Sequence, residues 1–593
     1  GGSLHDAGCI SCGLCIGTCP TGAIAERLTL EKPGPWKTDR TASVCSYCSV
    51  GCRLSFESLG DTLVSATRRE DDHVVFGTHC WQGRFGFHHL GGPGRLTAGQ
   101  VRENGAAVQA GVDEAIAAAA DRLTRALATC RPDEIAVFVS PRMTNEEAYL
   151  AQKLARGILG THQVASFGAL VNQAYFAPEA IASATYQDLA AADALVVAGA
   201  RLAEERFTLH LAAARAARGG ASIVWIGPEP DRTADLADVC LQCRPGAEPL
   251  VAAGIAAAAL RRAGEDPVSH PDLGMVASLG PSQWLEWTGV EAEAIERAAE
   301  RVRAASRRVF VFDADYRGER RTGDARAYAA AARALGCALL PAREGANAQG
   351  LLDVGAHPAW LPGYRPRHGG AAGDLERLWG VPLVALSSPA PDLAWQLADR
   401  RIKVALAFGI DPLGASGIPD ALRAGLAAAD LLIAGDVFPT ATTRAAHVVL
   451  PMSSSVETSG TMTNAERRVQ RLRRVIPPPS GLETWQVLCA LGRALGGRGF
   501  DHASPDEIFE EIRRAAPIYR QVTVDAEGPE GLWDAGIFPL PPVPAVSSAS
   551  APSRPVPTSG LDATSARFAA WFEKRVPRPA LTSLRAENDD GGV

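Results

Sequence analysis

The middle of the chain, from about residue 105 to 500, alternates short apolar runs with longer Ala-rich stretches. Runs of Val, Ile, Leu and Phe that end in Gly or Asp are typical of strands buried on both faces. The longer stretches, such as 114–128 and 145–159, have the composition of helices. This alternation predicts an α/β fold with parallel sheets covered by helices on both faces. The predicted strands are 135–139, 194–198, 222–226, 308–312, 404–408 and 431–434.

The two ends of the chain have a different texture. Residues 1–36 are Gly- and Cys-rich and predict a small ferredoxin-like unit, and 37–92 predict a second small unit with strands near 53–56 and 73–76. The α/β body then covers 93–538, with two interleaved domains expected. Residues 539–593 are rich in Pro, Ser and Ala and predict a linker and tail, with one short amphipathic piece at 565–575.

Composition narrows the class of protein. The chain has 593 residues, a net charge of −7 and no basic stripe, which argues against a nucleic-acid binder. It has no run of 18 apolar residues and opens without a signal peptide, so we expect a cytoplasmic protein without a membrane span of its own. Eight of the 13 cysteines fall within the first 80 residues. Such crowding favours metal ligation in a reducing compartment over a disulfide framework.

The first cysteine set is Cys9, Cys12, Cys15 and Cys19, followed by Pro20. The spacing C-x2-C-x2-C-x3-C-P is typical of [4Fe–4S] ligands, and the small residues between the cysteines let the backbone turn tightly. In two-cluster ferredoxins the fourth cysteine binds the neighbouring cluster, so Cys19 either closes this cluster or serves another. A zinc knuckle, or a ligand role for His5, is the weaker interpretation.

The second set is Cys45, Cys48, Cys52 and Cys80, spaced C-x2-C-x3-C-x27-C. Three thiolates come from one loop and the fourth from a distant segment, which again suits a [4Fe–4S] cluster, with structural zinc as the alternative. We therefore predict two [4Fe–4S] clusters with these eight cysteines as ligands. Cys130, Cys337 and Cys489 stand in apolar surroundings, and Cys240 and Cys243 should face opposite sides of a strand, so core positions are expected for these five.

The sequence around the second set resembles the molybdopterin oxidoreductase superfamily. The resemblance rests on Cys45-Ser-Tyr-Cys-Ser-Val-Gly-Cys, on Cys80-Trp-Gln-Gly-Arg-Phe-Gly and on Arg95-Leu-Thr. Segments 347–358, 361–364, 447–451 and 457–470 resemble formate dehydrogenase alpha subunits and the large iron–sulfur subunit of respiratory complex I. Together these cover about residues 5 to 500. The resemblance implies the α/β fold already predicted from the strand pattern.

Several positions depart from the catalytic members of that family. A Lys that bridges cluster and pterin is replaced by Gln82, and the segment 166–176 lacks the Cys–His pair of formate dehydrogenases. The dinucleotide-binding turns appear as Gly199-Ala-Arg-Leu and Pro245-Gly-Ala-Glu, and the C-terminal barrel is expected to be missing. Arg343 matches the formate-binding Arg, so it is catalytic only if the chain is a formate dehydrogenase. We expect a degenerate pocket, filled by side chains such as Phe167, Leu170 and Tyr175 or by water, without bound molybdopterin guanine dinucleotide.

These observations predict an electron-transfer subunit of a multi-subunit oxidoreductase, with flavin- or NADH-handling or iron–sulfur partners. The chain shows no G-x-G-x-x-G fingerprint that would bind NAD directly. The alternative is the catalytic alpha subunit of a molybdenum or tungsten formate dehydrogenase. A role for His88 and His89 in tuning the second cluster is a minor hypothesis beside an exposed loop. Membrane association, if any, would come through the complex.

Overall fold

The computed structural model describes residues 9–24, 26, 37–69, 75–92, 94–171, 180–270, 273–313, 325–367, 369–383, 393–416 and 418–522. His5, Tyr175, the predicted linker and the 565–575 piece lie outside the described residues. Within the described part of the chain, no helix combines the length and apolar character needed to cross a membrane.

A seven-stranded sheet forms the core of the first α/β body, in the order β5-β4-β17-β16-β15-β6-β7. The five strands from β17 to β7 are parallel, and β4 and β5 extend the sheet as an antiparallel edge. The strands are β4 (Gly99–Glu103), β5 (Ala106–Ala110), β6 (Ile135–Val139), β7 (Val164–Ala165), β15 (Val404–Phe408), β16 (Leu431–Asp436) and β17 (Val448–Pro451). Every residue of β6 and β15 is buried, as their apolar runs predict.

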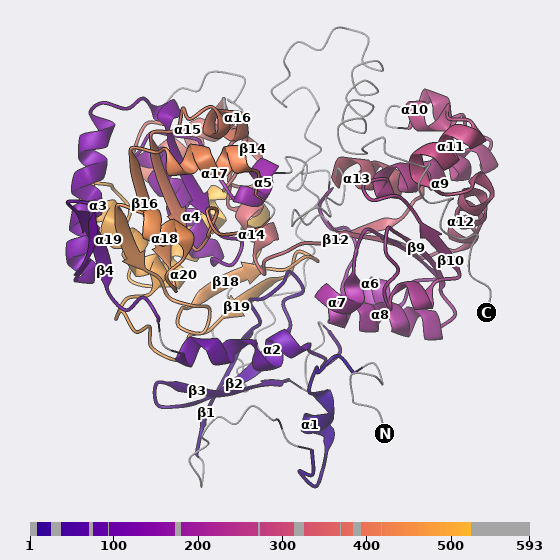
Figure 1. Cartoon of the computed structure of the whole chain (residues 1–593), viewed down its shortest axis with the longest axis horizontal. Helices are drawn as coiled ribbons and strands as arrows, with labels where there is room; N and C mark the ends of the chain where they lie inside the picture. The colour runs from indigo at the N-terminus through magenta and orange to yellow at the C-terminus, as the bar shows by residue number, and fades with distance from the viewer. Residues whose placement is uncertain are drawn as a thin grey trace, which may run out of the picture.

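Helices cover this sheet and surround it (Figure 1). The predicted helices at 114–128 and 145–159 are confirmed as α3 and α4. The helices of this body are α3 (Val112–Leu127), α4 (Asn145–Gly157), α5 (Phe167–Val171), α14 (Ala348–Asp353), α15 (Gly370–Trp379), α16 (Leu393–Ala398), α17 (Asp420–Ala427), α18 (Ala441–Ala445), α19 (Thr484–Ala494) and α20 (Pro505–Ala515). Two short strands, β13 (Trp360–Leu361) and β14 (Arg365–Pro366), pair beside them.

A second, five-stranded sheet is parallel throughout, in the order β10-β9-β8-β11-β12. Its strands are β8 (Ala194–Ala198), β9 (Ser222–Gly227), β10 (Val239–Gln242), β11 (Arg308–Asp313) and β12 (Ala338–Ala342). One face carries α6 (Tyr186–Ala190), α7 (Leu202–Glu205) and α8 (Phe207–Arg218). The other carries α9 (Glu248–Arg262), α12 (Ala292–Ala304) and α13 (Ala325–Ala334), with α10 (Gly274–Ala277) and α11 (Pro281–Thr288) farther out.

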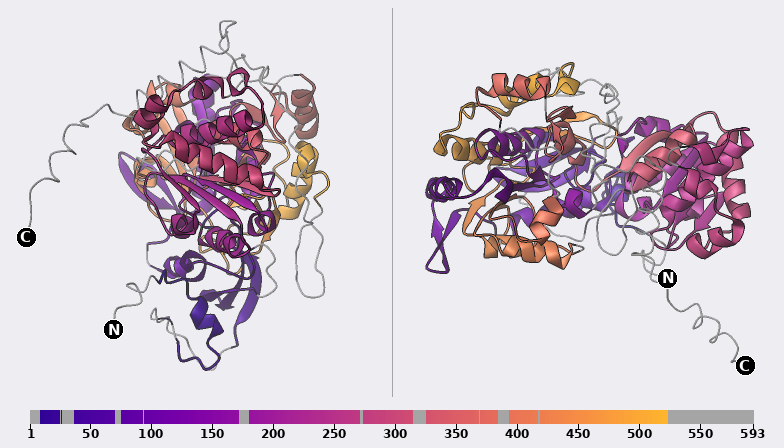
Figure 2. Two further views of the ribbon diagram at one scale, coloured as in Figure 1. Left: turned by 90° about the vertical axis from the view of Figure 1, so that its right-hand side faces the viewer. Right: turned by 90° about the horizontal axis from the view of Figure 1, so that it is seen from above.

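The chain therefore builds the first sheet in two passes. Strands β4 to β7 come before the whole five-stranded sheet in the sequence, and β15 to β17 come after it. Figure 1 and the right-hand view of Figure 2 show the two bodies side by side. All six predicted strands are confirmed as β6, β8, β9, β11, β15 and β16, so the α/β prediction holds.

A small antiparallel unit lies against both bodies, at the bottom of Figure 1. It contains α1 (Leu14–Thr18), the sheet β1 (Asp39–Val44), β2 (Arg53–Leu59) and β3 (Thr62–Arg68), and α2 (Trp81–Phe85). The hairpin of β18 (Gly460–Thr463) and β19 (Val469–Leu472) reaches it from the first body. The strand predicted near 73–76 is wrong at its two described residues, because Val75 and Phe76 lie in a turn and Phe76 has a φ of 57°.

Candidate iron–sulfur centres

The second cysteine set surrounds one loop of the small unit. Cys45 follows β1, Cys52 precedes β2, and the Cys45 N–H donates to the Cys52 carbonyl at 2.8 Å, which closes the loop between them. Cys80 directly precedes α2. Cys45 and Cys52 are buried, whereas Cys48 and Cys80 are partly exposed. The fold thus brings the loop at 45–52 together with a segment that follows the whole β2–β3 hairpin in the sequence.

The electrostatics of these thiols suit a bound cationic group. Burial raises the pKa of Cys45 well above its usual value, and the neighbouring Cys80 and Cys48 thiols raise it further. Burial also raises the pKa of Cys80, and the neighbouring Cys48 thiol raises it further, while the N–H groups of Gly83 and Gln82 lower it. Thiols that oppose one another's ionisation become thiolates when iron supplies the compensating charge. The donor set therefore fits a [4Fe–4S] cluster, although the ligand roles stay a prediction.

Among the described residues, no three His, Cys, Asp or Glu side chains gather closely enough to hold a single metal ion. A cubane makes a different demand on its ligands. Each of its four thiolates binds a different iron, so the sulfur atoms stand farther apart than the ligands of one ion.

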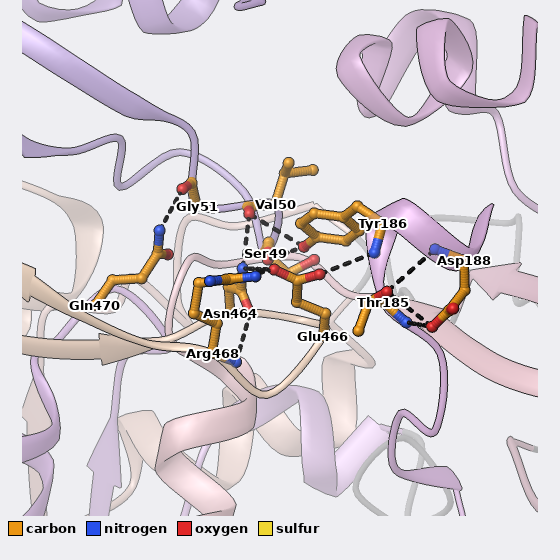
Figure 3. Close-up of polar contacts among 10 residues, drawn as sticks. All are labelled: Ser49, Val50, Gly51, Thr185, Tyr186, Asp188, Asn464, Glu466, Arg468 and Gln470. Atoms are coloured by element: carbon orange, nitrogen blue, oxygen red, sulfur yellow. Dashed lines mark hydrogen bonds and ion pairs between the residues drawn. The ribbon is translucent and has the colours of Figure 1, made fainter. Parts of the chain in front are cut away.

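Three backbone carbonyls of the cluster loop, those of Ser49, Val50 and Gly51, are held from outside the small unit (Figure 3). The Tyr186 hydroxyl donates to the Ser49 and Val50 carbonyls, each at 3.1 Å. The Asn464 amide donates to Val50 at 3.2 Å, and the Gln470 amide donates to Gly51 at 2.8 Å. The backbone N–H of Ala465 adds a 2.7 Å hydrogen bond to the Ser49 carbonyl. We call these donors the carbonyl cradle.

The cradle is itself fixed by buried polar contacts. Tyr186 is the first residue of α6, whose start is capped by reciprocal hydrogen bonds between Thr185 and Asp188. The Tyr186 N–H donates to Glu466 at 2.8 Å, and Arg468 pairs with the same carboxylate at 2.7 Å. Burial raises the pKa of Tyr186 well above 10, so its hydroxyl remains a donor. Glu466 thereby joins α6 to the β18–β19 turn (Figure 3).

Arg343 supports the same loop from another side. Its N–H donates to the Ser49 hydroxyl at 3.0 Å, and Cys48 forms an antiparallel bridge with Glu344. The Arg343 side chain is fully buried, and it donates to the Ala180 carbonyl and to Gln349, both at 2.8 Å. This position gives Arg343 a structural contact with the cluster loop, beyond the match to the formate-binding Arg.

The first cysteine set lies at the surface. Cys9 and Cys15 are exposed, and Cys12 and Cys19 are partly exposed. The Cys19 N–H donates to the Cys15 carbonyl at the end of α1. Its thiol is 3.5 Å from the Thr21 hydroxyl, and that hydrogen bond, helped by the Ile24 N–H, lowers the pKa of Cys19 to about 7. An easily ionised thiol is suited to bind iron.

The two cysteine sets meet across α2. A Cβ on Gly13 would stand 2.3 Å from Arg84 Cδ and 2.9 Å from Phe85 Cζ. On the neighbouring residue, a Cβ on Gly83 would stand 3.7 Å from Cys45 Sγ. Consecutive residues of this five-residue helix therefore face the two sets. Arg84 also lies 3.9 Å from Glu26.

Sequence reasoning missed several residues at this site. His79, next to Cys80, is buried, and within the described residues neither ring nitrogen has a hydrogen-bond partner. Burial, followed by Arg84 and Arg68, lowers its pKa to about 4, so it is neutral. Its position before Cys80 was the available signal. For Tyr186 the sequence offers none.

The remaining candidate residues are His88, His89 and the five cysteines outside the two sets. The His88 ring stacks on Phe85, and His89 is exposed with its ring 5.5 Å from that of Phe438. Cys243 is buried as expected, but Cys240 is exposed, so the core position expected for Cys240 is wrong: alternation along β10 places its side chain on the solvent face. Cys489 is a core residue, and Cys130 and Cys337 are partly buried against the core.

The segment that should bear metal ligands in a catalytic relative is described only from 166 to 171. Phe167 is buried, and its ring centroid is 4.6 Å from that of Phe138. Leu170 is also buried. Both apolar side chains therefore belong to the core of the first body.

The carboxyl edge of the five-stranded sheet retains buried polar groups. Glu248 begins α9 in the predicted Pro245-Gly-Ala-Glu turn, and burial raises its pKa to about 7. Among the described residues, its Oε2 and the Tyr328 hydroxyl have no hydrogen-bond partner. Unpaired buried polar atoms are costly, so this edge has capacity for a polar ligand.

Comparison with known proteins places the chain in a family. Residues 95–256 and 387–494 match the model of the molybdopterin oxidoreductases, and residues 38–91 match that of the molybdopterin oxidoreductase Fe4S4 domain. The solved structure of acetylene hydratase from Pelobacter acetylenicus shares the fold, with a TM-score of 0.61 and 16% identity over 80% of this chain and 71% of that one.

Curated relatives include subunits of several oxidoreductases. The chain is 30% identical to the NADPH-Fe(3+) oxidoreductase subunit alpha of Geobacter sulfurreducens, over 87% of this chain and 62% of that protein. It is 28% identical to the F420-dependent formate dehydrogenase 2 subunit alpha of Methanococcus maripaludis, with 83% and 75% covered. It is 27% identical to a subunit of an NADH-quinone oxidoreductase of Rhizobium meliloti, with 92% and 65% covered.

These matches confirm the resemblance to formate dehydrogenase alpha subunits and to a complex I subunit. The chain spans about three fifths of the length of the Geobacter relative, 62% of it. It is a member of the molybdopterin oxidoreductase family and carries that family's Fe4S4 domain.

Proposed function

We propose that this chain is the electron-transfer subunit of a multi-subunit oxidoreductase. Residues 1–36 would form a ferredoxin-like unit and 37–92 the family's Fe4S4 domain, each with one [4Fe–4S] cluster. The ligands would be Cys9, Cys12, Cys15 and Cys19 in the first unit, and Cys45, Cys48, Cys52 and Cys80 in the second. Each cluster would accept and release one electron. Thiolate ligands need a reducing compartment, which favours the cytoplasm.

The observation that carries this proposal is the contact of both cysteine sets with α2. Gly13 packs on Arg84 and Phe85, while Gly83 faces Cys45. Electron transfer slows steeply with distance, so two centres that both lie against one five-residue helix are well placed for exchange. The exposed Cys9 and Cys15 make the first set accessible to a redox partner. The buried Cys45 and Cys52 would hold the second cluster deeper in the protein.

The proposal includes a degenerate molybdopterin pocket. Its support is the Gln82 substitution, the core packing of Phe167 on Phe138, and the use of the Arg343 guanidinium by Ala180 and Gln349. The α/β bodies would then act as scaffold and docking surface for flavin- or NADH-handling or iron–sulfur partners. The names of the relatives, which describe subunits, agree with such an assembly.

A second candidate is the catalytic alpha subunit of a molybdenum or tungsten formate dehydrogenase. The buried, unpaired Oε2 of Glu248 and hydroxyl of Tyr328, among the described residues, favour it because a polar ligand would satisfy both. Arg343 would then contact formate.

Metal analysis of the purified chain and its complex separates the candidates. If the chain is an electron-transfer subunit, we expect about eight iron atoms per chain, from two [4Fe–4S] clusters, without molybdenum or tungsten. Stoichiometric molybdenum or tungsten, together with formate-dependent cluster reduction that Arg343→Ala abolishes, would establish the enzyme. Zinc in place of iron would refute both candidates.

A further inference from the structure

The carbonyl cradle controls the direction of three peptide units in the cluster loop. In a trans peptide, the C=O of one residue and the N–H of the next point in opposite directions. Donors hold the carbonyls of Ser49, Val50 and Gly51 from outside the loop. The N–H groups that share these three peptide units, those of Val50, Gly51 and Cys52, must therefore point away from those donors.

We propose that the cradle aims these N–H groups at the second cluster and so sets its reduction potential, with Tyr186 as the principal positioning residue. The inference rests on the proposed function, since it requires a [4Fe–4S] cluster on the second cysteine set. Hydrogen bonds to the sulfur atoms are among the factors that set cluster potentials. Because reduction adds negative charge, N–H groups directed at the sulfurs favour the reduced state.

Tyr186 is singled out because one hydroxyl joins two adjacent peptide units, each at 3.1 Å. Its ring is fully buried, and its position is fixed by the capped start of α6 and by Glu466. The residue belongs to the five-stranded body, whereas the loop belongs to the small unit. The second body thus acts on the cluster through this hydroxyl.

The substitution Tyr186→Phe should leave the fold intact. The Ser49 carbonyl keeps the Ala465 N–H, and the Val50 carbonyl keeps the Asn464 amide. What is lost is the donor that fixes the two peptides relative to each other. We expect the reduction equilibrium of the second cluster to fall about tenfold, which is about 59 mV more negative for one electron. Gln470→Leu removes the side-chain donor to Gly51, so the potential of the second cluster in this variant should shift in the same direction.

Tyr149→Phe is the control. Tyr149 is also fully buried, and its hydroxyl donates to Glu511 at 2.8 Å, outside the cradle. The substitution removes the same oxygen atom without touching the cradle, so the potential of the second cluster should not change.

An EPR-monitored redox titration of the full-length protein, with iron content measured on each sample, tests the proposal. A negative shift in Tyr186→Phe and Gln470→Leu, but not in Tyr149→Phe, supports it. Wild-type potentials in both cradle variants, with iron retained, overturn it. If Tyr186→Phe loses iron, the Gln470→Leu shift or its absence decides the matter. A wild-type chain without a second [4Fe–4S] signal would instead refute the proposed function.

Discussion

Substituting Gly13 with alanine should detach the first cysteine set from α2. Gly13 has a φ of 71°, a left-handed conformation that costs an alanine about 1–2 kcal/mol. The new Cβ would also stand 2.3 Å from Arg84 Cδ and 2.7 Å from Arg84 Nε. The Arg84 side chain is only 10% exposed, so it has little room to withdraw. The strain alone lowers the docked population by a factor of about 5–30.

Two other glycines separate the causes. Gly22 has a φ of 66° and nothing within 4 Å of an added Cβ, so Gly22→Ala introduces strain without the clash. Gly17 lies within α1, also with nothing within 4 Å, and Gly17→Ala should be neutral or stabilise by about 0.4–1 kcal/mol. The assay is EPR of the fully reduced protein, in which neighbouring paramagnetic clusters broaden each other's signals. We expect Gly13→Ala to lose this broadening and keep the second cluster's own signal. The same broadening in Gly13→Ala and wild type would refute the role of α2 as the contact between the sets.

Three further predictions concern the second cluster and the core. Cys48→Ser should remove one [4Fe–4S] signal and its iron while circular dichroism shows an intact α/β body; an unchanged spectrum and iron content would contradict the ligand assignment. Glu457→Gln should lower the free energy of unfolding by about 3–5 kcal/mol in chemical denaturation, because it breaks a buried pair with Arg95 at 2.6 Å. The exposed pair of Asp121 and Arg125 is the control, and Asp121→Asn should cost at most about 0.5 kcal/mol. Burial opposes ionisation of Glu511, yet His502 and Lys153 lower its pKa to about 2. The contribution of Glu511 to the free energy of unfolding is thus complete above the unfolded pKa of about 4.3 and is lost as pH falls towards 2. Glu511→Gln should reduce this dependence of the free energy of unfolding on pH, measured by denaturation at several pH values.

Much of the α/β body could be predicted from sequence because its strands are continuous apolar runs. Strands β6 and β15 are buried along their whole length, so no polar position disturbed the signal. The prediction near 73–76 failed at Val75 and Phe76, where an apolar run forms a turn that packs under Arg215. Strand β10 was expected around Cys240 but not counted among the six apolar strands, because half of its four residues are exposed.

The cysteine spacing indicated the candidate ligands, but the cradle lay beyond sequence reasoning. Its hydrogen bonds join residues 49–51 to Tyr186, 137 positions after Ser49, and to Asn464 and Gln470, 414 and 419 positions after their partners in the loop. The segment 457–470 was visible as a family resemblance, but the resemblance did not reveal what it holds. Only the folded chain shows that its amides meet the loop carbonyls.

The same long-range contacts impose an order on biosynthesis. A ribosome delivers Cys45, Cys48, Cys52 and Cys80 early, whereas Asn464 and Gln470 emerge hundreds of residues later. The seven-stranded sheet also waits for β15 to β17, which follow the entire five-stranded sheet. A cluster inserted on the nascent chain would therefore sit in a loose, solvent-accessible loop until translation is nearly complete. Iron–sulfur loading after release, or shielding by a carrier during synthesis, follows from this arrangement.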